Sequence, residues 1–452
     1  MITFVVPLAI YLLSFPVMLV TLFRVEVGIL FFALIVPIIS LVQKLNAFPQ
    51  GNNFGDFLLV SMVVGWILGS LRKGRKIFVS SPVNLVVILV MLNSLINLIR
   101  GYTFIASPEE TNLIRLMAWK NYMILPVLYF ISINNVEKEK LLWLIIICIS
   151  FTLLAMDFNF YSTFRWIRAE HYRHSIRISG PFGFLGPNEL GIFYSMYTFL
   201  LLGISYFIEN KRIKYFVLFV CACNIYPIMY SFSRAAYMCT LTGLLIIGIL
   251  KDKKFIALLI VLVLLYGFIL PRAVVERIDN TFLEEGNISE EEARSSAFEV
   301  GDVTIEVTGR KVLWEKAINY FETEPILGIG FDSFREIEGW ITHSLFMRIL
   351  AEQGLVGMTV FVIFTITILI QAYRLFRNSP SKLGQGIGLG FFTCIIVHLV
   401  GSTVGDQTLY YNMMAIYWFF IGIVARLNSN LIKGRGRDNS DREKHYTSDT
   451  KT

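Results

Sequence analysis

The sequence predicts an all-α polytopic membrane protein. Of its 452 residues, 55% are hydrophobic and only 16% are charged, whereas charged residues make up about 25% of soluble domains. Apolar runs long enough to cross a bilayer, about 17 to 25 residues each, recur along the whole length. Several of the short connectors between these runs are basic. These observations together exclude a soluble globular fold.

We expect 12 to 13 transmembrane helices. The candidate spans lie at about residues 2–23, 27–43, 57–71, 83–99, 116–133, 141–157, 189–208, 215–232, 235–250, 255–270, 354–373, 384–404 and 409–425. The first run has no basic segment before it and no clear small-residue cleavage site after it. It is therefore interpreted as a span and not as a cleaved signal peptide.

The basic connectors predict the orientation of the chain. They are residues 72–76, 211–214, 251–254 and 374–382, together with the tail after Arg426. With thirteen spans, every one of these segments falls on the same side of the membrane. Because positive loops stay on the cytoplasmic side, we expect the N-terminus outside and the C-terminus in the cytoplasm.

Arginine and lysine are distributed unequally between the two sides. In this topology the cytoplasmic side carries 13 Lys and 10 Arg, and the outer side carries 4 Lys and 13 Arg. Both residue types serve topology equally well, so topology does not explain the arginine excess outside. Arginine is preferred where a planar fork must grip phosphate or carboxylate. The excess indicates either an anion site or pairing with the outer acidic residues.

The span pattern divides the chain into four parts. Residues 1–270 form an N-terminal bundle of about ten spans, with an outer loop at 158–188. Residues 271–353 form a large extracytoplasmic loop, and residues 354–425 hold the last spans. Residues 426–452 are polar and are predicted to be a disordered cytoplasmic tail.

The large outer loop contains two expected amphipathic helices. The first follows Gly309-Arg310 and ends at Pro325. Its predicted apolar stripe consists of Leu313, Trp314, Ala317, Ile318 and Phe321. The second starts near Thr342. Helices of this kind in an outer loop lie on the membrane surface or cover a cavity.

His343 lies where the outer loop re-enters the membrane. An imidazole pKa near 6.5 suits a general base, although a histidine at an interface can equally bond to backbone. Glu352 is spaced to pair with Arg348 at i, i+4, which is a structural role. Gly354 and Gly357 open the following span and are expected to allow close helix packing.

Three further polar positions are candidates for the site. Arg234 lies between two closely spaced spans, where an arginine is expensive and indicates function or snorkelling to the interface. Arg177 precedes the glycine- and proline-rich segment SGPFGFLGPNELG, in which Asn188 is expected to cap the next helix. Arg310, at the expected start of the stripe helix, either binds an anion or faces solvent.

The chemistry of these residues suits transfer from a lipid-linked donor. The sequence contains no P-loop, dinucleotide fingerprint or metal-binding histidine pair. We therefore expect no cofactor, no metal and no nucleic-acid partner. An outer enzyme has no nucleotide sugar, so its donor must arrive on a lipid diphosphate. Arginines can hold that diphosphate as it leaves, and a histidine can deprotonate the attacking hydroxyl.

The motifs themselves resemble those of the O-antigen ligase/polymerase superfamily of bacterial envelope glycosyltransferases. The resemblance is carried by TGRKVLWEKAINYFETEPILGIGFDSF, which contains Trp314, Gly328 and Gly330, and by THSLFMRILAEQGLVG. SFSR is similar to the family's Ser-Arg element, and RISGPFGFLGPNELG to its Arg…Gly…Pro-Asn element. Ser344 departs from the asparagine that is common after the histidine. The resemblance covers most of the chain from about residue 175.

The resemblance implies a helical fold of the glycosyltransferase C type with an outer cavity beneath a loop cap. It also implies metal-independent, inverting transfer of a glycan from undecaprenyl diphosphate. By motif position, Arg234 and Arg310 would bind the diphosphate, with Arg177 as a further contact, and His343 would be the base.

We expect a polymerase of a surface polysaccharide in the bacterial inner membrane. Its substrate would be an undecaprenyl-diphosphate-linked oligosaccharide in membrane lipid, and a chain-length regulator and a flippase are candidate partners. The same residues would serve a ligase that transfers the finished glycan to lipid A core or another acceptor. A flippase of lipid-linked sugar would need polar residues distributed through the spans, and the spans here are nearly free of charge.

Overall fold

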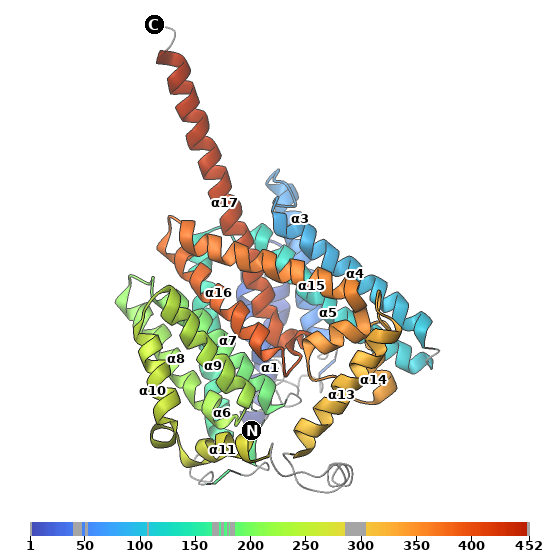
Figure 1. Cartoon of the computed structure of the whole chain (residues 1–452). Helices are drawn as coiled ribbons and strands as arrows, with labels where there is room; N and C mark the ends of the chain where they lie inside the picture. Colours follow the sequence, from blue (N-terminus) through green and yellow to red (C-terminus); the bar gives the residue numbers. More distant parts are fainter. Residues whose placement is uncertain are drawn as a thin grey trace.

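The structure, a computed structural model, is built from helices packed side by side (Figure 1). It describes residues 2–38, 48–49, 53–105, 108–164, 171–172, 176–178, 180, 186–284 and 304–449. Within these ranges every regular element is helical and no strand occurs. The all-α membrane fold predicted from the sequence is confirmed.

Each expected span overlaps a helix in the described part of the chain, and residues 39–43 of the expected span 27–43 lie outside the described residues. These helices are α1 (Ile2–Thr21), α2 (Val25–Ile35), α3 (Phe54–Arg72), α4 (Pro82–Phe104), α5 (Glu109–Asn135), α6 (Glu139–Thr163), α7 (Pro187–Ser205), α8 (Lys211–Tyr230), α9 (Arg234–Leu250), α10 (Lys254–Ile269), α15 (Leu345–Asn378), α16 (Lys382–Gly401) and α17 (Tyr411–Asp449). The remaining elements are η1 (Val36–Ile38), α11 (Arg272–Glu284), α13 (Thr304–Thr323), α14 (Ser333–Glu338) and η7 (Gln407–Leu409).

Fewer helices than expected are long enough to span a membrane alone. Among the described residues, eight helices meet the length and hydropathy requirement, or nine if α10 and the start of α11, bent by 109°, form one broken span. Pro7–Thr21, Val25–Ile38 and Arg234–Leu250 are apolar but shorter. The expected 12 to 13 spans therefore correspond to helices, and eight or nine of these meet the requirement within the described residues.

Helix α7 lies at the centre of the bundle. It packs against α8, α9 and α16, and nearly all its residues from Leu190 onward are buried. Its contact with α16 is a close backbone approach, because a Cβ on Gly203 would lie 2.4 Å from the Gly390 Cα atom. Small residues permit such approaches between membrane helices. The beginnings of α7 and α9 are thereby fixed relative to the end of α16.

Short polar side chains define where several helices begin. At each of these positions the side-chain oxygen accepts a hydrogen bond from a backbone N–H of the first turn. The capping residues are Ser81 of α4, Asn210 of α8, Ser233 of α9, Ser344 of α15 and Ser381 of α16. Two of these caps directly follow or precede candidate site residues, since Ser233 precedes Arg234 and Ser344 follows His343.

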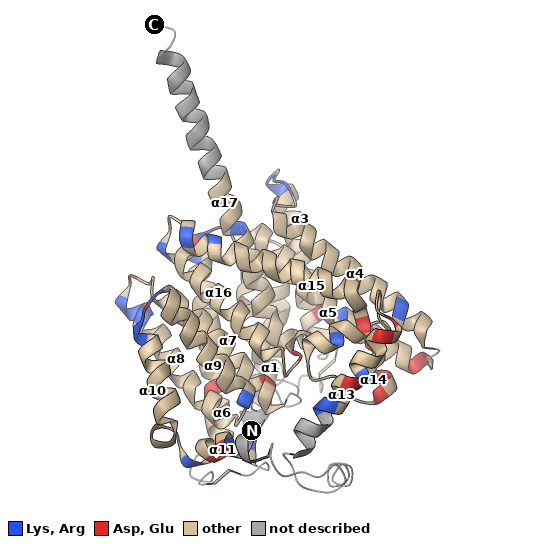
Figure 2. Cartoon of the chain, viewed as in Figure 1, with Lys and Arg blue, Asp and Glu red and all other residues tan. Residues whose placement is uncertain are grey.

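The charged residues separate toward two ends of the bundle (Figure 2). Lys and Arg without many acidic neighbours lie at the connectors that end α3, join α8 and α10 to their neighbours and join α15 to α16. The helices of the outer loop, α11, α13 and α14, lie away from these connectors and carry both signs of charge. This separation is the one that the positive connectors predict.

The first outer-loop helix differs from its prediction. Helix α13 begins at Thr304, so Arg310 lies in its second turn and not at its start. Within the expected stripe, Ile318 is 40% exposed, while Tyr320 packs against the core around Ala317 instead. The buried face is rotated because α13 packs on α15 along this side. The helix ends at Thr323, before Pro325, as expected.

One other boundary is corrected. The second outer helix begins at Leu345, after the Ser344 cap, and not near Thr342. Helix α17 runs from Tyr411 to Asp449 and therefore extends into residues 426–452, the segment predicted to be a disordered tail.

Candidate functional site

Three residues other than glycine adopt a left-handed backbone conformation in the described part of the chain. They are Phe232 (φ 50°), Asp332 (φ 60°) and His343 (φ 51°). Each costs free energy for an L-residue, and such strain tends to concentrate at functional sites. All three lie in the motif segments recognised in the sequence: Phe232 in SFSR, Asp332 after GIGF, and His343 in THS.

The backbone around His343 is held from both sides. The indole Nε1 of Trp314 donates to the Thr342 carbonyl at 3.0 Å. The Thr342 hydroxyl donates to the Ser344 carbonyl at 2.8 Å, and the Leu345 N–H reaches the Ser402 carbonyl at 3.1 Å. Thr342 and Ser344 are buried, while His343 between them is half-buried. The turn therefore presents the imidazole from a fixed position at the start of α15.

Arg310 lies one helical turn before Trp314 on α13. Residues four apart share one face of a helix, about 6 Å apart along its axis. The Trp314 contact with Thr342 thus brings this face of α13 alongside the His343 turn. The Nε of Arg310 is buried without a hydrogen-bond partner among the described residues. A buried unsatisfied donor is costly, which makes Arg310 ready to receive an anion.

Helix α15 is broken at Gly354, and the loop after α13 fills the break. Gly354 has φ 59° and ψ −156°. The Leu355 and Val356 N–H groups donate to the carbonyls of Pro325 and Ile326 at 2.8 and 3.1 Å. Gly354 was expected to permit helix packing. It instead admits a loop, since a Cβ there would lie 2.5 Å from the Ile326 carbonyl oxygen.

The glycines of the GIG segment make the other half of this contact. The N–H groups of Ile329 and Gly330 donate to the carbonyls of Ala351 and Glu352, each at 2.9 Å. A Cβ on Gly328 would lie 2.4 Å from the Glu352 carbonyl carbon, and one on Gly330 would lie 2.2 Å from the Gly101 nitrogen. Both positions need glycine because backbone approaches backbone. Gly357, by contrast, faces the Gln353 side chain of its own helix.

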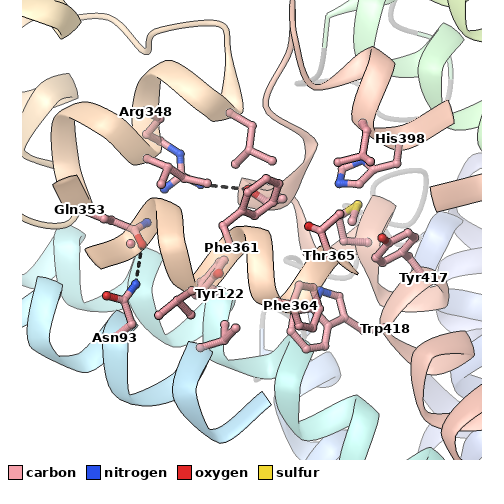
Figure 3. A pocket seen from close by; sticks show the side chains of 18 residues that line it. Asn93, Tyr122, Arg348, Gln353, Phe361, Phe364, Thr365, His398, Tyr417 and Trp418 are labelled. Carbon is pink, nitrogen blue, oxygen red and sulfur yellow. Dashed lines mark hydrogen bonds between the residues drawn. The ribbon is translucent and has the colours of Figure 1, made fainter. Parts of the chain in front are cut away.

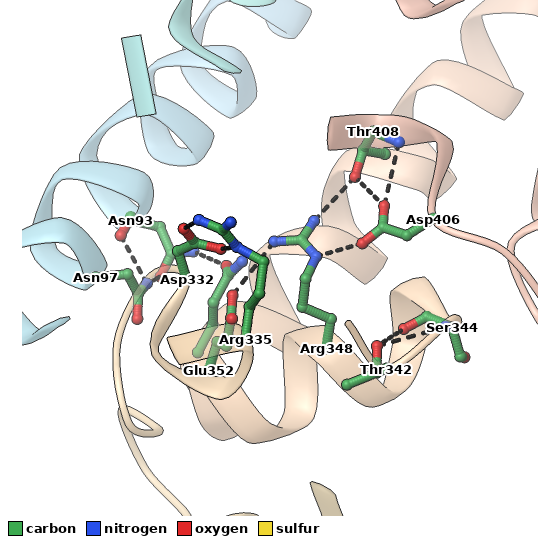
Figure 4. A network of polar contacts seen from close by, with 11 residues as sticks. Asn93, Asn97, Asp332, Arg335, Thr342, Ser344, Arg348, Glu352, Asp406 and Thr408 are labelled. Carbon is green, nitrogen blue, oxygen red and sulfur yellow. Dashed lines mark hydrogen bonds and ion pairs between the residues drawn. The ribbon is translucent and has the colours of Figure 1, made fainter. Parts of the chain in front are cut away.

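A buried ionic network lies beneath the His343 turn (Figure 4). Arg348 contacts Asp406 through Nε, donates to the Thr408 hydroxyl at 2.9 Å, and lies 3.5 Å from a Glu352 carboxylate oxygen. All three charged groups are less than one-tenth exposed. The predicted pair of Glu352 with Arg348 is confirmed. Asp406, the closer partner, was not predicted, because it comes from a different hairpin.

Ion pairs bear on the arginine excess that the predicted topology places outside. Carboxylate partners are present for five arginines of the outer side: Arg100 with Glu324, Arg115 with Glu336, Arg272 with Glu276, Arg335 with Asp332, and Arg348 with Asp406. These pairs support the structural explanation. Arg310, in the motif that begins TGRKVLW, is not one of these five arginines.

Arg177 joins two motifs that are far apart in sequence. Its Nη2 donates to the Asn188 side-chain oxygen at 2.7 Å, and its Nε donates to the Ser231 carbonyl at 3.4 Å. The prediction that Asn188 caps α7 is wrong: Gly186 occupies the cap position, and no side chain caps this helix. The Asn188 oxygen is engaged by the Arg177 guanidinium, which is the stronger donor.

Arg277 of α11 completes this group and was not singled out in the sequence. It is 1% exposed. Its Nε donates to the Phe232 carbonyl at 3.3 Å, and its guanidinium carbon lies 4.9 Å from the centre of the Tyr172 ring. A signal did exist, because Arg277 lies in the short amphipathic segment AVVERI, between Glu276 and Ile278. Nothing in that pattern indicated which carbonyl it would reach.

The two groups lie at the same end of the bundle. The Ser402 carbonyl that holds Leu345 follows Gly401, where a Cβ would contact Ile192 of α7 and Cys239 of α9. Tyr410, directly before α17, lies at this end as well, and its N–H donates to the Gln407 carbonyl at 3.1 Å. Burial raises the pKa of Tyr410 to about 12, with Glu189 and Asp406 adding to the rise and Arg335 opposing it. Glu189 begins α7, while Arg335 belongs to α14.

A small cavity lies beside the ionic network, between α4, α15, α16 and α17 (Figure 3). It has an internal volume of about 50 Å³, and its wall is mostly apolar. Asn93 donates to Gln353 at 2.7 Å on one side, and His398 and Tyr417 lie on the other, with Phe361 between them. This volume holds water but not a sugar, so the cavity does not accommodate the substrate.

The described residues contain no cluster of three or more histidine, cysteine, aspartate or glutamate side chains that could hold a metal ion. The candidate polar groups at this end of the bundle are guanidinium donors and an imidazole. Such a set can grip a phosphate-like anion and accept a proton. Arg234, the first residue of α9, is half-buried beside the Ser233 cap. The structure therefore places Arg177 and Arg234 in one group, and Arg310 and His343 in the other.

Comparison with known proteins agrees with the motifs. Residues 215–362 match the family model described as O-Antigen ligase. The matched segment contains Arg234, Arg310 and His343, whereas Arg177 and Asn188 precede it. This match confirms the resemblance to the O-antigen ligase/polymerase superfamily. No curated protein matches the chain.

Proposed function

We propose that the chain polymerises a bacterial surface polysaccharide, such as O-antigen, capsule or exopolysaccharide. The family match supports a multi-pass membrane glycosyltransferase of the O-antigen ligase/polymerase type that acts on lipid-linked glycans. In the finer proposal, the glycan leaves undecaprenyl diphosphate and joins a sugar hydroxyl of the next lipid-linked repeat unit. The observation that carries this proposal is the strained His343 turn, held by Trp314, which lies one helical turn from Arg310 and its buried Nε.

In the proposed reaction, the acceptor hydroxyl oxygen attacks the anomeric carbon of the donor. The bond from that carbon to the diphosphate oxygen breaks, and attack from the opposite face inverts the configuration. His343 takes the hydroxyl proton. Arg234 and Arg310, with Arg177 beside them, bind the diphosphate and stabilise the charge that it gains on leaving. Diphosphate needs no general acid, so one base and several arginines are sufficient.

The proposed location is the inner membrane, with the site on the extracytoplasmic face and the C-terminus in the cytoplasm. The basic connectors support this orientation, since they lie away from the outer-loop helices (Figure 2). A polymerase in this place would work beside a flippase that delivers repeat units and a regulator that sets chain length. Crosslinking from α11 or α13 would identify such partners.

The second candidate is a ligase that transfers the finished glycan to lipid A core or another acceptor. The description of the matching family favours it. Both reactions use the same donor chemistry and differ only in the acceptor. Deleting the gene for this chain distinguishes the polymerase from the ligase. One repeat unit left on the acceptor indicates a polymerase, whereas an unmodified acceptor with polymerised glycan still on its carrier indicates a ligase.

The residues are tested by complementing the deletion strain. His343→Ala should restore neither transfer nor the ladder of surface glycan, although the protein inserts normally. His445→Ala, in the C-terminal segment, is the matched control and should restore both. Arg234→Lys and Arg310→Lys should each lose most activity because lysine cannot form a planar fork. Full activity of His343→Ala would exclude the proposed base, and full activity of both lysine variants would exclude the diphosphate contacts.

A further inference from the structure

We propose that Arg277 is a positioning residue that fixes the turn at Phe232 and thereby aims Arg234 at the diphosphate of the donor. This inference rests on the proposed function, because it assigns Arg277 a role through a diphosphate ligand. Arg277 lies on α11, outside every motif that the sequence indicated. Its contacts, its burial and the strain of the turn that it holds carry the argument.

The turn between α8 and α9 is strained and held by two cations. Phe232 is completely buried with φ 50°, a conformation that a bulky L-residue rarely adopts. Arg177 donates to the carbonyl before it, at Ser231, and Arg277 donates to its own carbonyl. Two guanidinium groups from separate segments thus hold successive carbonyls. A charged donor makes a stronger bond than a neutral one, which suits a turn that must not relax.

Exposure decides how Arg277 can act. At 1% exposed it has no open surface through which to touch a substrate. Its guanidinium instead packs over the Tyr172 ring, 4.9 Å from the ring centre. Arg234 lies only two residues beyond Phe232 and is half-buried. The direction of the Arg234 side chain is set by the turn, so a change at Arg277 reaches the ligand through Arg234.

Helix α11 is itself tied to the segment that carries Arg177. Glu276 accepts a hydrogen bond from the Tyr172 N–H at 2.8 Å and lies 2.8 Å from the His171 Nδ1. Glu276 and Arg277 are adjacent on α11. Glu276 contacts the segment around Tyr172, and Arg277 contacts the Phe232 turn. Helix α11, the segment around Tyr172 and the Phe232 turn form one unit, in which Arg277 supplies the contact nearest to Arg234.

The test measures binding of undecaprenyl diphosphate to the purified full chain in lipid nanodiscs. This probe needs no knowledge of the sugar. Arg277→Met keeps the length of the side chain but removes its charge and its hydrogen bonds. The Kd for undecaprenyl diphosphate should rise by on the order of tenfold, while the Kd for undecaprenol, which lacks the diphosphate, stays unchanged. Arg212→Met is the matched control, because Arg212 is exposed in the first turn of α8 and is not part of this unit.

A double-mutant cycle separates positioning from direct contact. If Arg277 acts through Arg234, then Arg277→Met changes the Kd less than about twofold in an Arg234→Met background. If the changes in Kd of the two single variants multiply fully in the double variant, Arg277 makes an independent contact and the inference is overturned. An unchanged Kd in Arg277→Met alone would also overturn it. An Arg234→Met variant that binds normally would instead refute the proposed function. The two failures are therefore distinguishable.

A merely structural role makes a different prediction. It would weaken binding of undecaprenol as much as that of undecaprenyl diphosphate, and this result would also overturn the inference. If Arg277→Met does not insert stably, Arg277→Lys enters the same cycle, since lysine keeps the charge and one donor. If neither the methionine nor the lysine variant folds, Arg277 is required for folding and the positioning role is refuted.

Discussion

Replacing Trp314 with phenylalanine should slow glycan transfer without unfolding the protein. The change removes one hydrogen bond, from the indole to the Thr342 carbonyl at 3.0 Å, and keeps an aromatic ring on α13. Thr342 is 1% exposed, so its carbonyl loses a partner that water cannot readily replace. A buried acceptor left unsatisfied costs about 1 to 3 kcal/mol.

That cost is comparable with the strain at the next residue. A left-handed L-residue such as His343, with φ 51°, costs roughly 1 to 3 kcal/mol. Without the indole the turn can relax, and the imidazole then spends less time where it can take the hydroxyl proton. Because 1.4 kcal/mol is a factor of ten, we expect kcat to fall about tenfold or somewhat more.

The assay uses lipid-linked glycan isolated from the deletion strain and the purified chain in nanodiscs. The kcat should fall while the Kd for undecaprenyl diphosphate changes little. Trp119→Phe is the matched control, since the Trp119 indole donates to the Ser94 carbonyl at 3.2 Å in a different part of the bundle. An unchanged kcat for Trp314→Phe, or an equal loss in Trp119→Phe, would refute this account of the turn.

Three other predictions concern stability, measured as thermal unfolding in detergent. Gly330→Ala should destabilise strongly, because its Cβ would lie 2.2 Å from the Gly101 nitrogen. Gly339 also has a positive φ but has open space around it, so Gly339→Ala should cost only about 1 kcal/mol. Equal losses of stability in the two variants would exclude the close approach as the cause. Arg348→Met leaves buried Asp406 and Glu352 without their guanidinium and should cost roughly 3 to 5 kcal/mol, while Arg348→Met combined with Asp406→Asn should recover part of that loss; no recovery would contradict the pairing. Partial burial raises the pKa of Glu338, but hydrogen bonds from Lys316 and Tyr320 outweigh it and hold that pKa below its ordinary value of 4.5. The contact therefore stabilises above that value and is lost as the pH falls through the lower, folded pKa; Glu338→Gln should remove this acid sensitivity, and an unchanged acid profile would count against it.

Local pattern was sufficient for the helices and for several site positions. The prediction of each span depends on the composition of about twenty residues. Such runs form helices in the structure because, in lipid, backbone polar groups can bond only to one another. Arg234 was placed between two spans and His343 before the helix that follows the loop, because short connectors are also local features. Glu352 could be paired with Arg348 from their spacing alone.

Contacts between distant segments were not legible. Asp406 lies 58 residues after Arg348, and no periodicity connects a buried carboxylate with an arginine on another hairpin. The Asn188 prediction failed for the same reason, since a capping pattern considers only the local backbone and the competing donor is Arg177. Ile318 was predicted to be buried but is exposed, and Tyr320 packs against the core instead. The reason is that the partner helix, α15, determines which face of α13 is covered.

The break in α15 means that the outer loop is not an appendage of the membrane bundle. Four backbone hydrogen bonds join residues 325–330 to the two sides of Gly354. Cutting the loop away would leave two amide donors and two carbonyls of α15 without these partners, and lipid tails offer none in their place. The part of the chain that carries Arg310 thus completes the folding of a transmembrane helix. Grafting this loop onto another bundle would succeed only where that bundle also offers a broken helix to receive it.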